Sequence, residues 1–469
     1  MQEKYPTIET LFEQIKTITY QVDQLQQAGT YLTEENQKLQ RENQELKEKL
    51  AKYETPKNSS NSSIPPSKDE NRPRKTTSLR TSTGKKPGGQ KGRKGNTLKM
   101  SSTPNFIEQS IPSTCGRCGD GLDTKGAILT GRRQIYDIPP IEMMVTEHQV
   151  YSSKCSCGHI TQGDFPAHVQ SPVSYGPNIE ALIGYFHARQ FLPFKRMQEM
   201  FRDIFQAPIS EGGLHHLLGR LAKKALPTYE AIRKSIWESF VNGSDESSAR
   251  VNGMLYWFWV WQNLRHTYLV CSDNRGFATV EEHFPLGFPE KVLVSDALPA
   301  QLKTPAKHYQ CCLAHLQRNL KHLNELYRDN SWGNRFLKLL YDSLQVKKEM
   351  RPGDYQGEHR PKKEILKRFN KLLNRPPDKR QKELVTFYNR MKRDKEHIFT
   401  FLDFEDVPPD NNASERAIRN IKVKLKISGQ FKTPQAAQKF AVLRSVIDTA
   451  IKQGENVIAS LTNIALLPV

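Results

Sequence analysis

Three acidic residues stand where a folded sheet would bring them together. Asp245 lies in VNGSDESSARVNG, Asp296 ends the apolar run KVLVSD, and Glu415 follows DNNAS at the start of a cationic segment. Carboxylate oxygens are ligands that Mg²⁺ prefers, and a pair of such ions stabilises the attacking and leaving oxygens of a phosphodiester. Because the chain has 50 Asp and Glu residues, surface carboxylates are the alternative interpretation.

Two close cysteine pairs form a second candidate site. CGRC contains Cys115 and Cys118, and CSC contains Cys155 and Cys157. Four thiolates on two glycine-containing turns fit a tetrahedral zinc site, structural because no ligand position stays open. The second pair is C-x-C, so His159 remains a candidate ligand. Redox pairs or disulfides are the alternative, which a reducing compartment disfavours.

The pattern around the acids predicts the elements that position them. The runs GMLYWFWVWQN and RHTYLVCSDN predict a β-hairpin around residues 263–266, with Asp245 at its head. KVLVSD and KHYQCC predict two further strands, and residues 313–327 predict a helix. Strands, then a strand tipped by Asp296, then a late helical Glu415 is the order of an RNase H-like sheet. The segment between cysteines alternates as short strands would.

Charge indicates the partner. The formal net charge of +20 and the pI near 9.5 favour a polyanion, nucleic acid first, since bound phosphates release counterions. A merely solubilising surface is the alternative. No run of about 18 apolar residues predicts a membrane span, and MQEKYPTIET has no apolar signal core. We therefore expect a cytoplasmic, nucleoid-associated protein.

The first segment has a heptad repeat that predicts a coiled coil. One seam position holds Ile8, Ile15, Val22, Gly29, Asn36, Asn43 and Leu50. The other holds Leu11, Ile18, Leu25, Leu32, Leu39, Leu46 and Tyr53. Asn at two successive a positions favours an in-register parallel homodimer, although a higher oligomer or a single solvated helix would carry the same repeat.

Between the heptads and the cysteines the chain is rich in Ser, Pro, Gly and Lys/Arg, which is typical of a segment that does not fold alone. It is either a flexible linker or a basic arm that contacts phosphates. Helices predicted within 172–235, with Ser210 as an N-cap, resemble a helix-turn-helix. That arrangement would put His215, His216 and Arg220 near DNA, but helical hairpins are also common without a DNA role.

Five features in order resemble the transposases of the IS66 group of bacterial insertion sequences, over nearly the whole chain. After the coiled coil come an arm with KNSS and KPGGQKGRKG, the cysteine module, and a helical segment with YGP at 175–177 and LPFKR at 192–196. The last feature is a domain with DES at Asp245, SD at Asp296, CLAHLQR at 312–318 and PDNNASERAIR at 409–419. DES replaces the more usual DET, and Gly-Tyr does not follow Asp296.

The resemblance implies a DNA transposase with Asp245, Asp296 and Glu415 as a DDE triad. Two Mg²⁺ ions would support 3′-end cleavage and strand transfer into target DNA, and Zn²⁺ would be structural. His315 and Arg318 share a helix face and would contact DNA or stabilise the site, with a packed structural His315 as the alternative. The residues expected to bind DNA are Lys85, Lys86, Lys91, Arg93, Lys94, His315, Arg318, Arg416, Arg419, Lys422 and Lys424.

These expectations define a multidomain α+β protein. The predicted parts are a coiled coil (1–53), a disordered basic linker (54–100), a zinc-binding β module (101–170), a helical DNA-binding segment (171–238), an RNase H-like core (239–330), a helical insertion (331–400), and the rest of the core with C-terminal helices (401–469). Transposon ends, target DNA and accessory proteins of the element are the expected partners. A catalytically inactive dimeric DNA-binding protein and a nuclease for RNA–DNA hybrids are the competing hypotheses.

Overall fold

The computed structural model describes residues 8–58, 61, 69–70, 92, 94, 97–166, 169, 171–327 and 330–468. The chain divides into two compact units. The larger comprises residues 1–72, 149–198 and 210–469, and the smaller comprises residues 73–148 and 199–209. Among the predicted DNA-binding residues, Lys85, Lys86, Lys91 and Arg93 lie outside the described residues.

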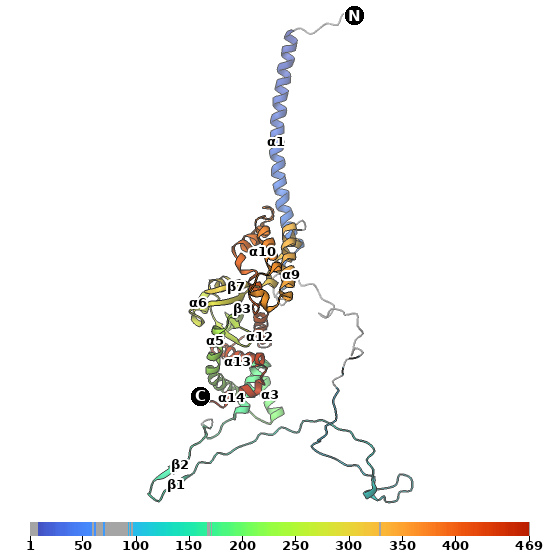
Figure 1. The fold of residues 1–469 in the computed structure, drawn as a ribbon, viewed down its shortest axis with the longest axis vertical. Coiled ribbons are helices and arrows are strands. Elements are labelled where there is room, and N and C mark those ends of the chain that lie inside the picture. The colour runs from blue at the N-terminus through green and yellow to red at the C-terminus, as the bar shows by residue number, and fades with distance from the viewer. Residues whose placement is uncertain are drawn as a thin grey trace. The chain divides into compact units, whose positions relative to one another are not determined.

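A five-stranded mixed sheet in the larger unit carries two of the predicted carboxylates (Figure 1). Its order is β5–β4–β3–β6–β7, in which β3, β4 and β5 are antiparallel, while β6 runs parallel to β3 and β7 parallel to β6. The strands are β3 (Val241–Val251), β4 (Met254–Gln262), β5 (Thr267–Ser272), β6 (Phe288–Ser295) and β7 (Ala306–Cys311). The predicted hairpin around residues 263–266 and the two strands after it are confirmed.

The segment before that hairpin is a full strand. β3 pairs with β4 from Gly243 to Val251, and the two are joined by Asn252 and Gly253, whose φ angles are 48° and 76°. Positive φ at both central residues matches the right-handed twist of a two-residue hairpin, and Asn-Gly adopts it at low cost. This Asn-Gly pair was a local signal for the strand that holds Asp245.

The outer strand β5 has its free edge covered by α13 (Pro434–Gln453). The backbone N–H groups of Thr267, Leu269 and Cys271 donate to side-chain oxygens of Thr449, Ser445 and Gln438. An uncovered edge would present these donors to other strands. The side chains of α13 therefore end the sheet.

The basic segment 331–400 is helical, as predicted, and shares a hydrophobic core with the sheet. Its helices are α9 (Ser331–Glu349), α10 (Arg360–Leu373) and α11 (Lys382–Arg393). One cluster of buried residues joins Val292 and Val294 of β6 to α8 (Leu313–Leu326), and through it to these three helices. Figure 1 shows α9 and α10 in orange. The insertion is therefore continuous with the core of the sheet.

The predicted helices before the sheet are present. They are α2 (Pro177–Gly184), a π-helical turn (Tyr185–Arg189), α3 (Phe194–Phe205), α4 (Glu211–Lys224) and α5 (Leu226–Glu238). Ser210 caps α4 as predicted, accepting from the backbone N–H of Gly213 at 3.1 Å. Arg220 forms an ion pair with the buried Glu180. This arginine is therefore engaged in packing α4 against α2.

The remaining described α-helices are α1 (Ile8–Glu54), α6 (Phe277–His283), α7 (Pro299–Lys303), α12 (Asn412–Ser428) and α14 (Val457–Ala465). The predicted heptad segment is one helix of 47 residues, and the side chains of its apolar seam are exposed. Within the described part of the chain, no helix is both long and apolar enough to cross a membrane.

Candidate metal centre on the sheet

Asp245 lies within β3, opposite Val260 of β4, and is partly buried. Its Oδ1 accepts from the backbone N–H of Glu246 at 2.9 Å. Burial raises the pKa of the Asp245 carboxyl well above its usual range, and the negative charges of Asp296, Glu246 and Glu415 raise it further. The three predicted carboxylates thus share one electrostatic environment.

Asp296 directly follows β6, as the sequence predicted. The next residue, Ala297, has a φ of 63°, a left-handed conformation that glycine adopts more readily. The backbone N–H of Ala297 donates to Ser295 Oγ at 3.2 Å, which holds this turn. Backbone strain at such a position is typical of functional sites. Here it turns the chain sharply beside the acid.

Glu415 lies in the first turn of α12, and Asn411 fixes that helix to the sheet. The Asn411 side-chain amide donates to the Ser244 carbonyl at 2.8 Å, and its backbone N–H donates to Cys312 Sγ at 3.2 Å. No contact between Asn411 and the sheet was predicted. Asn411 stands at the N-cap position without a side-chain capping bond, because its side chain is used for β3.

Gly243 allows α12 to approach β3 closely. A Cβ atom at this position would lie 2.6 Å from Ser414 Oγ and 2.4 Å from Gln262 Nε2. Those two side chains are hydrogen-bonded to each other at 3.3 Å. The glycine before Asp245 is therefore part of what brings the helix bearing Glu415 to the sheet. Sequence reasoning missed it because the contact joins residues distant in the chain.

His315 lies between two of the carboxylates. Its Nδ1 is 3.1 Å from Asp296 Oδ1 and 3.9 Å from Glu415 Oε1. Asp296 Oδ1 and Glu415 Oε1 therefore both lie within 3.9 Å of this one nitrogen atom. Among the described residues, ligand atoms of Asp296, Cys312 and His315 also lie within 4.8 Å of one another. His315 is thus at the site itself.

Arg318 supports the same arrangement from the next turn of α8. Its Nη2 lies 3.0 Å from His315 Nε2 and 3.3 Å from Glu415 Oε1. An arginine can only donate, so it favours the tautomer in which His315 Nε2 accepts and Nδ1–H faces Asp296. This pair holds the second and third carboxylates in position. Among the two roles predicted for His315 and Arg318, this geometry favours stabilisation of the site.

The donor chemistry fits a hard divalent cation. Carboxylate oxygens of Asp296 and Glu415 lie near His315 Nδ1, and the charges of both residues act on the partly buried Asp245. Mg²⁺ prefers such oxygen ligands and offsets their repulsion. The cations that the structure supplies, Arg318 and Arg419, contact Glu415. The residues present therefore fit the metal that the sequence predicted.

The basic residues of α12 fall on two faces. Arg416 and Arg419 are exposed, and Arg419 lies 3.3 Å from Glu415 Oε2. Lys422 is partly buried and donates to the Ser248 carbonyl. Lys424 is only 4% exposed, and burial lowers the pKa of its ammonium to about 8. The prediction that Lys424 binds DNA phosphates is corrected, because Lys424 shares the buried face of α12 with Ile421.

The first cysteine pair belongs to the smaller unit. The backbone N–H of Cys115 donates to the Asp120 carbonyl and that of Gly119 to the Cys115 carbonyl, which closes a tight turn around Cys118. Gly119 has a φ of 81°. Backbone N–H groups of Arg117 and Cys118 lower the pKa of the Cys115 thiol. A lowered pKa favours the thiolate that binds metal.

The second pair belongs to the larger unit and has a similar turn. Strands β1 (Ser152–Lys154) and β2 (Ile160–Gln162) form a hairpin whose loop holds Cys155 and Cys157. The backbone N–H of Gly158 donates to the Cys155 carbonyl at 2.8 Å, and hydrogen bonds from Cys157 lower the pKa of Cys155. In the alternating segment 132–155, β1 is a strand as expected, whereas residues 132–151 form no strand. Large apolar side chains of residues 132–151, such as Ile135, are exposed.

Glu246 is a further acid at the centre that sequence reasoning left without a role. Its side chain is 8% exposed and forms an ion pair with Arg275 at 2.9 Å. Gln301 Nε2 donates to its other oxygen at 3.1 Å. Burial raises the pKa of the Glu246 carboxyl, although Arg275 opposes this. Its place next to Asp245 in DES was the signal available in the sequence.

Comparisons with known families identify two domains of the chain. Residues 172–439 match the model described as "Transposase IS66 family", and residues 112–158 match the zinc-finger binding domain of transposase IS66. Residues 4–99 match a family of unknown function, DUF6444. No curated protein matches the chain. The matches define a transposase that carries a zinc-finger domain.

The particular family follows from the extent of the first match, which covers more than half of the chain and contains Asp245, Asp296 and Glu415. The protein belongs to the IS66 family of transposases. The resemblance predicted from the five sequence features is confirmed. The zinc-finger match also supports the predicted structural Zn²⁺, since it covers all four cysteines.

Proposed function

We propose that this transposase cleaves DNA at transposon 3′ ends and transfers the strand to a target, with Asp245, Asp296 and Glu415 as ligands of two Mg²⁺ ions. The observation that carries this is the partly buried Asp245 carboxyl among three other carboxylates. Gathering like charges away from water is costly unless a cation or a proton compensates. A catalytic cation explains why the chain retains the arrangement.

The topology of the sheet supports an RNase H-like fold for this domain. A three-stranded antiparallel meander is followed by two strands parallel to its first strand, which gives the order β5–β4–β3–β6–β7. In that fold the acids would come from β3, from the end of β6 and from a late helix. The positions of Asp245, Asp296 and Glu415 correspond to these elements.

The bound ions would activate the attacking oxygen and neutralise charge on the leaving oxygen. His315 and Arg318 keep Asp296 and Glu415 oriented, and Asn411 holds α12 on β3. In the first step a water oxygen bonds to phosphorus and the 3′-hydroxyl leaves with a proton. In the second step that hydroxyl attacks a target phosphodiester, and a target 3′-hydroxyl leaves. Arg416 and Arg419 would bind adjacent phosphates.

The remaining parts have roles that follow from their chemistry. Cys115, Cys118, Cys155 and Cys157 would bind one structural Zn²⁺. Helix α1 would pair with a second copy through its exposed seam, which places two catalytic domains in one assembly. Accessory proteins of the element, and the basic arm with Lys94, would add contacts to the transposon ends or target.

The test is a cleavage and strand-transfer assay on a plasmid carrying the coding region with its own flanking DNA, in Mg²⁺ and in EDTA. We expect Asp245→Asn, Asp296→Asn and Glu415→Gln each to lower the rate by at least about a thousandfold, since metal ligation supplies several kcal/mol. Asp410→Asn is the matched control. Asp410 Oδ1 accepts from the Asn412 N–H, a role that an asparagine oxygen can fill.

The alternative, a catalytically inactive DNA-binding protein, gives a different result in the same assay. It would bind the flanking DNA but leave it intact in Mg²⁺, with wild type and the three variants alike. Short inverted repeats in the flanks identify the ends to be cut. Full activity of Glu415→Gln with loss in Asp410→Asn would instead reassign the third carboxylate.

A further inference from the structure

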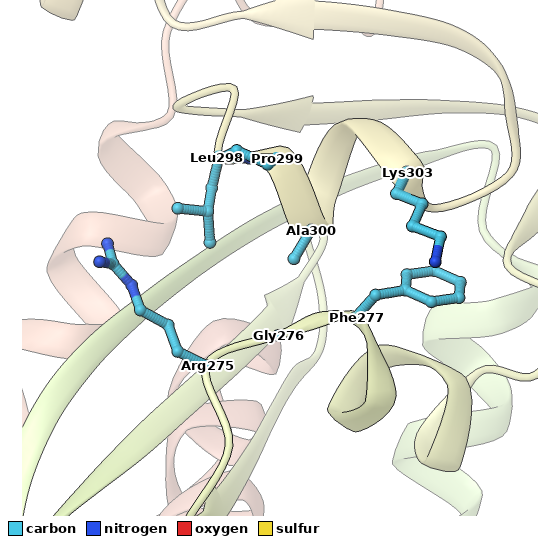
Figure 2. A pocket seen from close by; sticks show the side chains of 7 residues that line it. All are labelled: Arg275, Gly276, Phe277, Leu298, Pro299, Ala300 and Lys303. Atoms are coloured by element: carbon cyan, nitrogen blue, oxygen red, sulfur yellow. The ribbon is translucent and has the colours of Figure 1, made fainter.

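A pocket of about 400 Å³ opens beside the metal centre, between the loop before α6 and the short helix α7. Figure 2 shows the side chains that line it. They are Arg275, Gly276, Phe277, Leu298, Pro299, Ala300 and Lys303. The pocket is open to solvent, and most of its lining surface is apolar. The mechanism above makes no use of it.

The lining combines an apolar interior with two cations. Phe277, Leu298 and Ala300 contribute hydrocarbon and an aromatic ring, while Arg275 and Lys303 lie on different sides of the opening (Figure 2). Lys303 Nζ lies 4.6 Å from the centroid of the Phe277 ring. An aromatic ring with one cation beside it, and a second cation across the opening, suits a planar, polarisable group that carries negative charge nearby. A nucleotide has both properties.

The pocket is coupled to the metal centre by two short connections. Arg275 is held by the Glu246 ion pair and lies over the Trp257 ring, 4.5 Å from its centroid. Glu246 is the residue after Asp245. On the other wall, Leu298 is two residues after Asp296, beyond the strained Ala297. A DNA strand whose phosphate is at the carboxylates would therefore have neighbouring nucleotides within reach of the pocket.

We propose that this pocket binds one unpaired nucleotide of a DNA strand, with its base against Phe277 and its phosphates near Arg275 and Lys303. The inference rests on the proposed DNA transposition. The apolar lining offers few hydrogen-bonding groups to read a base edge, so binding would tolerate any base. Unpairing a terminal base would position the scissile phosphate at the metal centre.

The test uses the full-length protein in EDTA and compares two fluorescent DNAs of the same duplex sequence. One is blunt, and the other has a three-thymidine 3′ overhang. We expect the overhang to bind about tenfold more tightly, since stacking of a base on an aromatic side chain has effects of that order. Phe277→Ala should abolish the difference and leave blunt-duplex affinity unchanged, whereas Phe277→Tyr should retain it.

Two further variants distinguish binding in the pocket from general effects of a substitution on folding or on DNA affinity. Leu298→Trp should fill the space and abolish the overhang preference with an intact fold, which thermal melting checks. Leu264→Ala, at a residue 90% exposed in the β4–β5 turn, is the control and should retain the preference. Placing 5-iodouracil in the overhang should give a photo-crosslink to the peptide that contains Phe277.

The outcomes distinguish the pocket from the proposed function. Equal affinity of wild type for both DNAs would overturn the pocket proposal and leave transposition standing. An overhang preference that survives both Phe277→Ala and Leu298→Trp would do the same. Excess free thymidine monophosphate should compete for the pocket and reduce the preference, and a preference that the free nucleotide does not reduce would overturn the pocket proposal. Absence of any DNA binding would overturn both.

Discussion

Helices α1 and α12 both have an apolar stripe, but the two stripes have opposite surroundings. In α1, Leu25 and Leu32 are 72% and 65% exposed, whereas in α12 Ile418 and Ile421 are 6% and 0% exposed. The partner of α12 is the sheet of the same chain, reached through Asn411. The stripe itself predicts a helix in both cases, and only the fold distinguishes an internal partner from an external one.

The largest effect expected from the difference between α1 and α12 comes from the seam of α1. Leu25→Glu together with Leu32→Glu should raise the dissociation constant for self-association by at least about a hundredfold, because two carboxylates would enter a buried seam. Sedimentation of the full-length protein at several concentrations measures this. Gln27→Glu adds charge off the seam and should leave association intact.

Wild-type protein that sediments as a monomer at all concentrations would contradict self-association through α1. The exposed stripe of α1 would then have another partner, and the homodimer proposal would fail. A dimer that persists in the Leu25 and Leu32 variant would place the self-association surface elsewhere in the chain. Either result leaves the centre on the sheet unaffected, since none of its residues lies in α1.

The second prediction concerns how α12 sits on the sheet. Gly243→Ala should lower the free energy of unfolding by roughly 1–3 kcal/mol, because the new Cβ would overlap Ser414 and Gln262 in a packed interface. Chemical denaturation measures the change. Gly212→Ala in the first turn of α4 is the control, since no heavy atom lies closer to its added Cβ than 4.0 Å.

A tolerated Gly243→Ala would mean that α12 moves away from β3 without cost. The cleavage assay would then test the role assigned to Gly243, because Glu415 must move together with α12. Stability unchanged and activity lost would show that the close approach serves the carboxylates. Stability and activity both unchanged would contradict the role assigned to Gly243.

Periodicity predicted most of the strands and helices because hydrophobic patterning is a local property. The triad of Asp245, Asp296 and Glu415 was predicted from their places on those elements, together with the family resemblance, and it stays a prediction. Lys424 shows where this approach failed. Its spacing from Ile421 put it on the buried face of α12, but its charge was weighted above its position. Asn411 and Gly243 act through contacts with residues remote in sequence, which one chain's pattern does not reveal.

The third prediction concerns the cost in stability of placing the Asp245 carboxylate close to other carboxylates. Helix α1 does not bear such a cost. The folded pKa of Asp245 is raised above the value of 3.8 for a free carboxyl. The folded state therefore binds this proton more tightly, and the resulting stability is present below pH 3.8 and lost as pH rises through the folded pKa. In EDTA, Asp245→Asn should raise the melting temperature at neutral pH.

Melting curves from pH 4 to 8 with and without Mg²⁺ check this. The difference between variant and wild type should grow with pH in EDTA and shrink when Mg²⁺ is added, because the cation compensates the ionised carboxylates. Asp23→Asn on exposed α1 should leave the wild-type pH dependence in place. A variant less stable than wild type at neutral pH in EDTA would contradict the cost assigned to Asp245.

The smallest effect distinguishes the two faces of α12. Arg419 is exposed beside Glu415 and Lys424 is buried, so only Arg419→Ala should weaken DNA binding. Loss of one phosphate contact should reduce the slope of log affinity against log salt by about 1. Lys424→Met should keep that slope and alter only stability, since its hydrocarbon chain packs in the interior. Equal slopes for Arg419→Ala and wild type, with a reduced slope for Lys424→Met, would mean that α12 presents its other face when DNA binds.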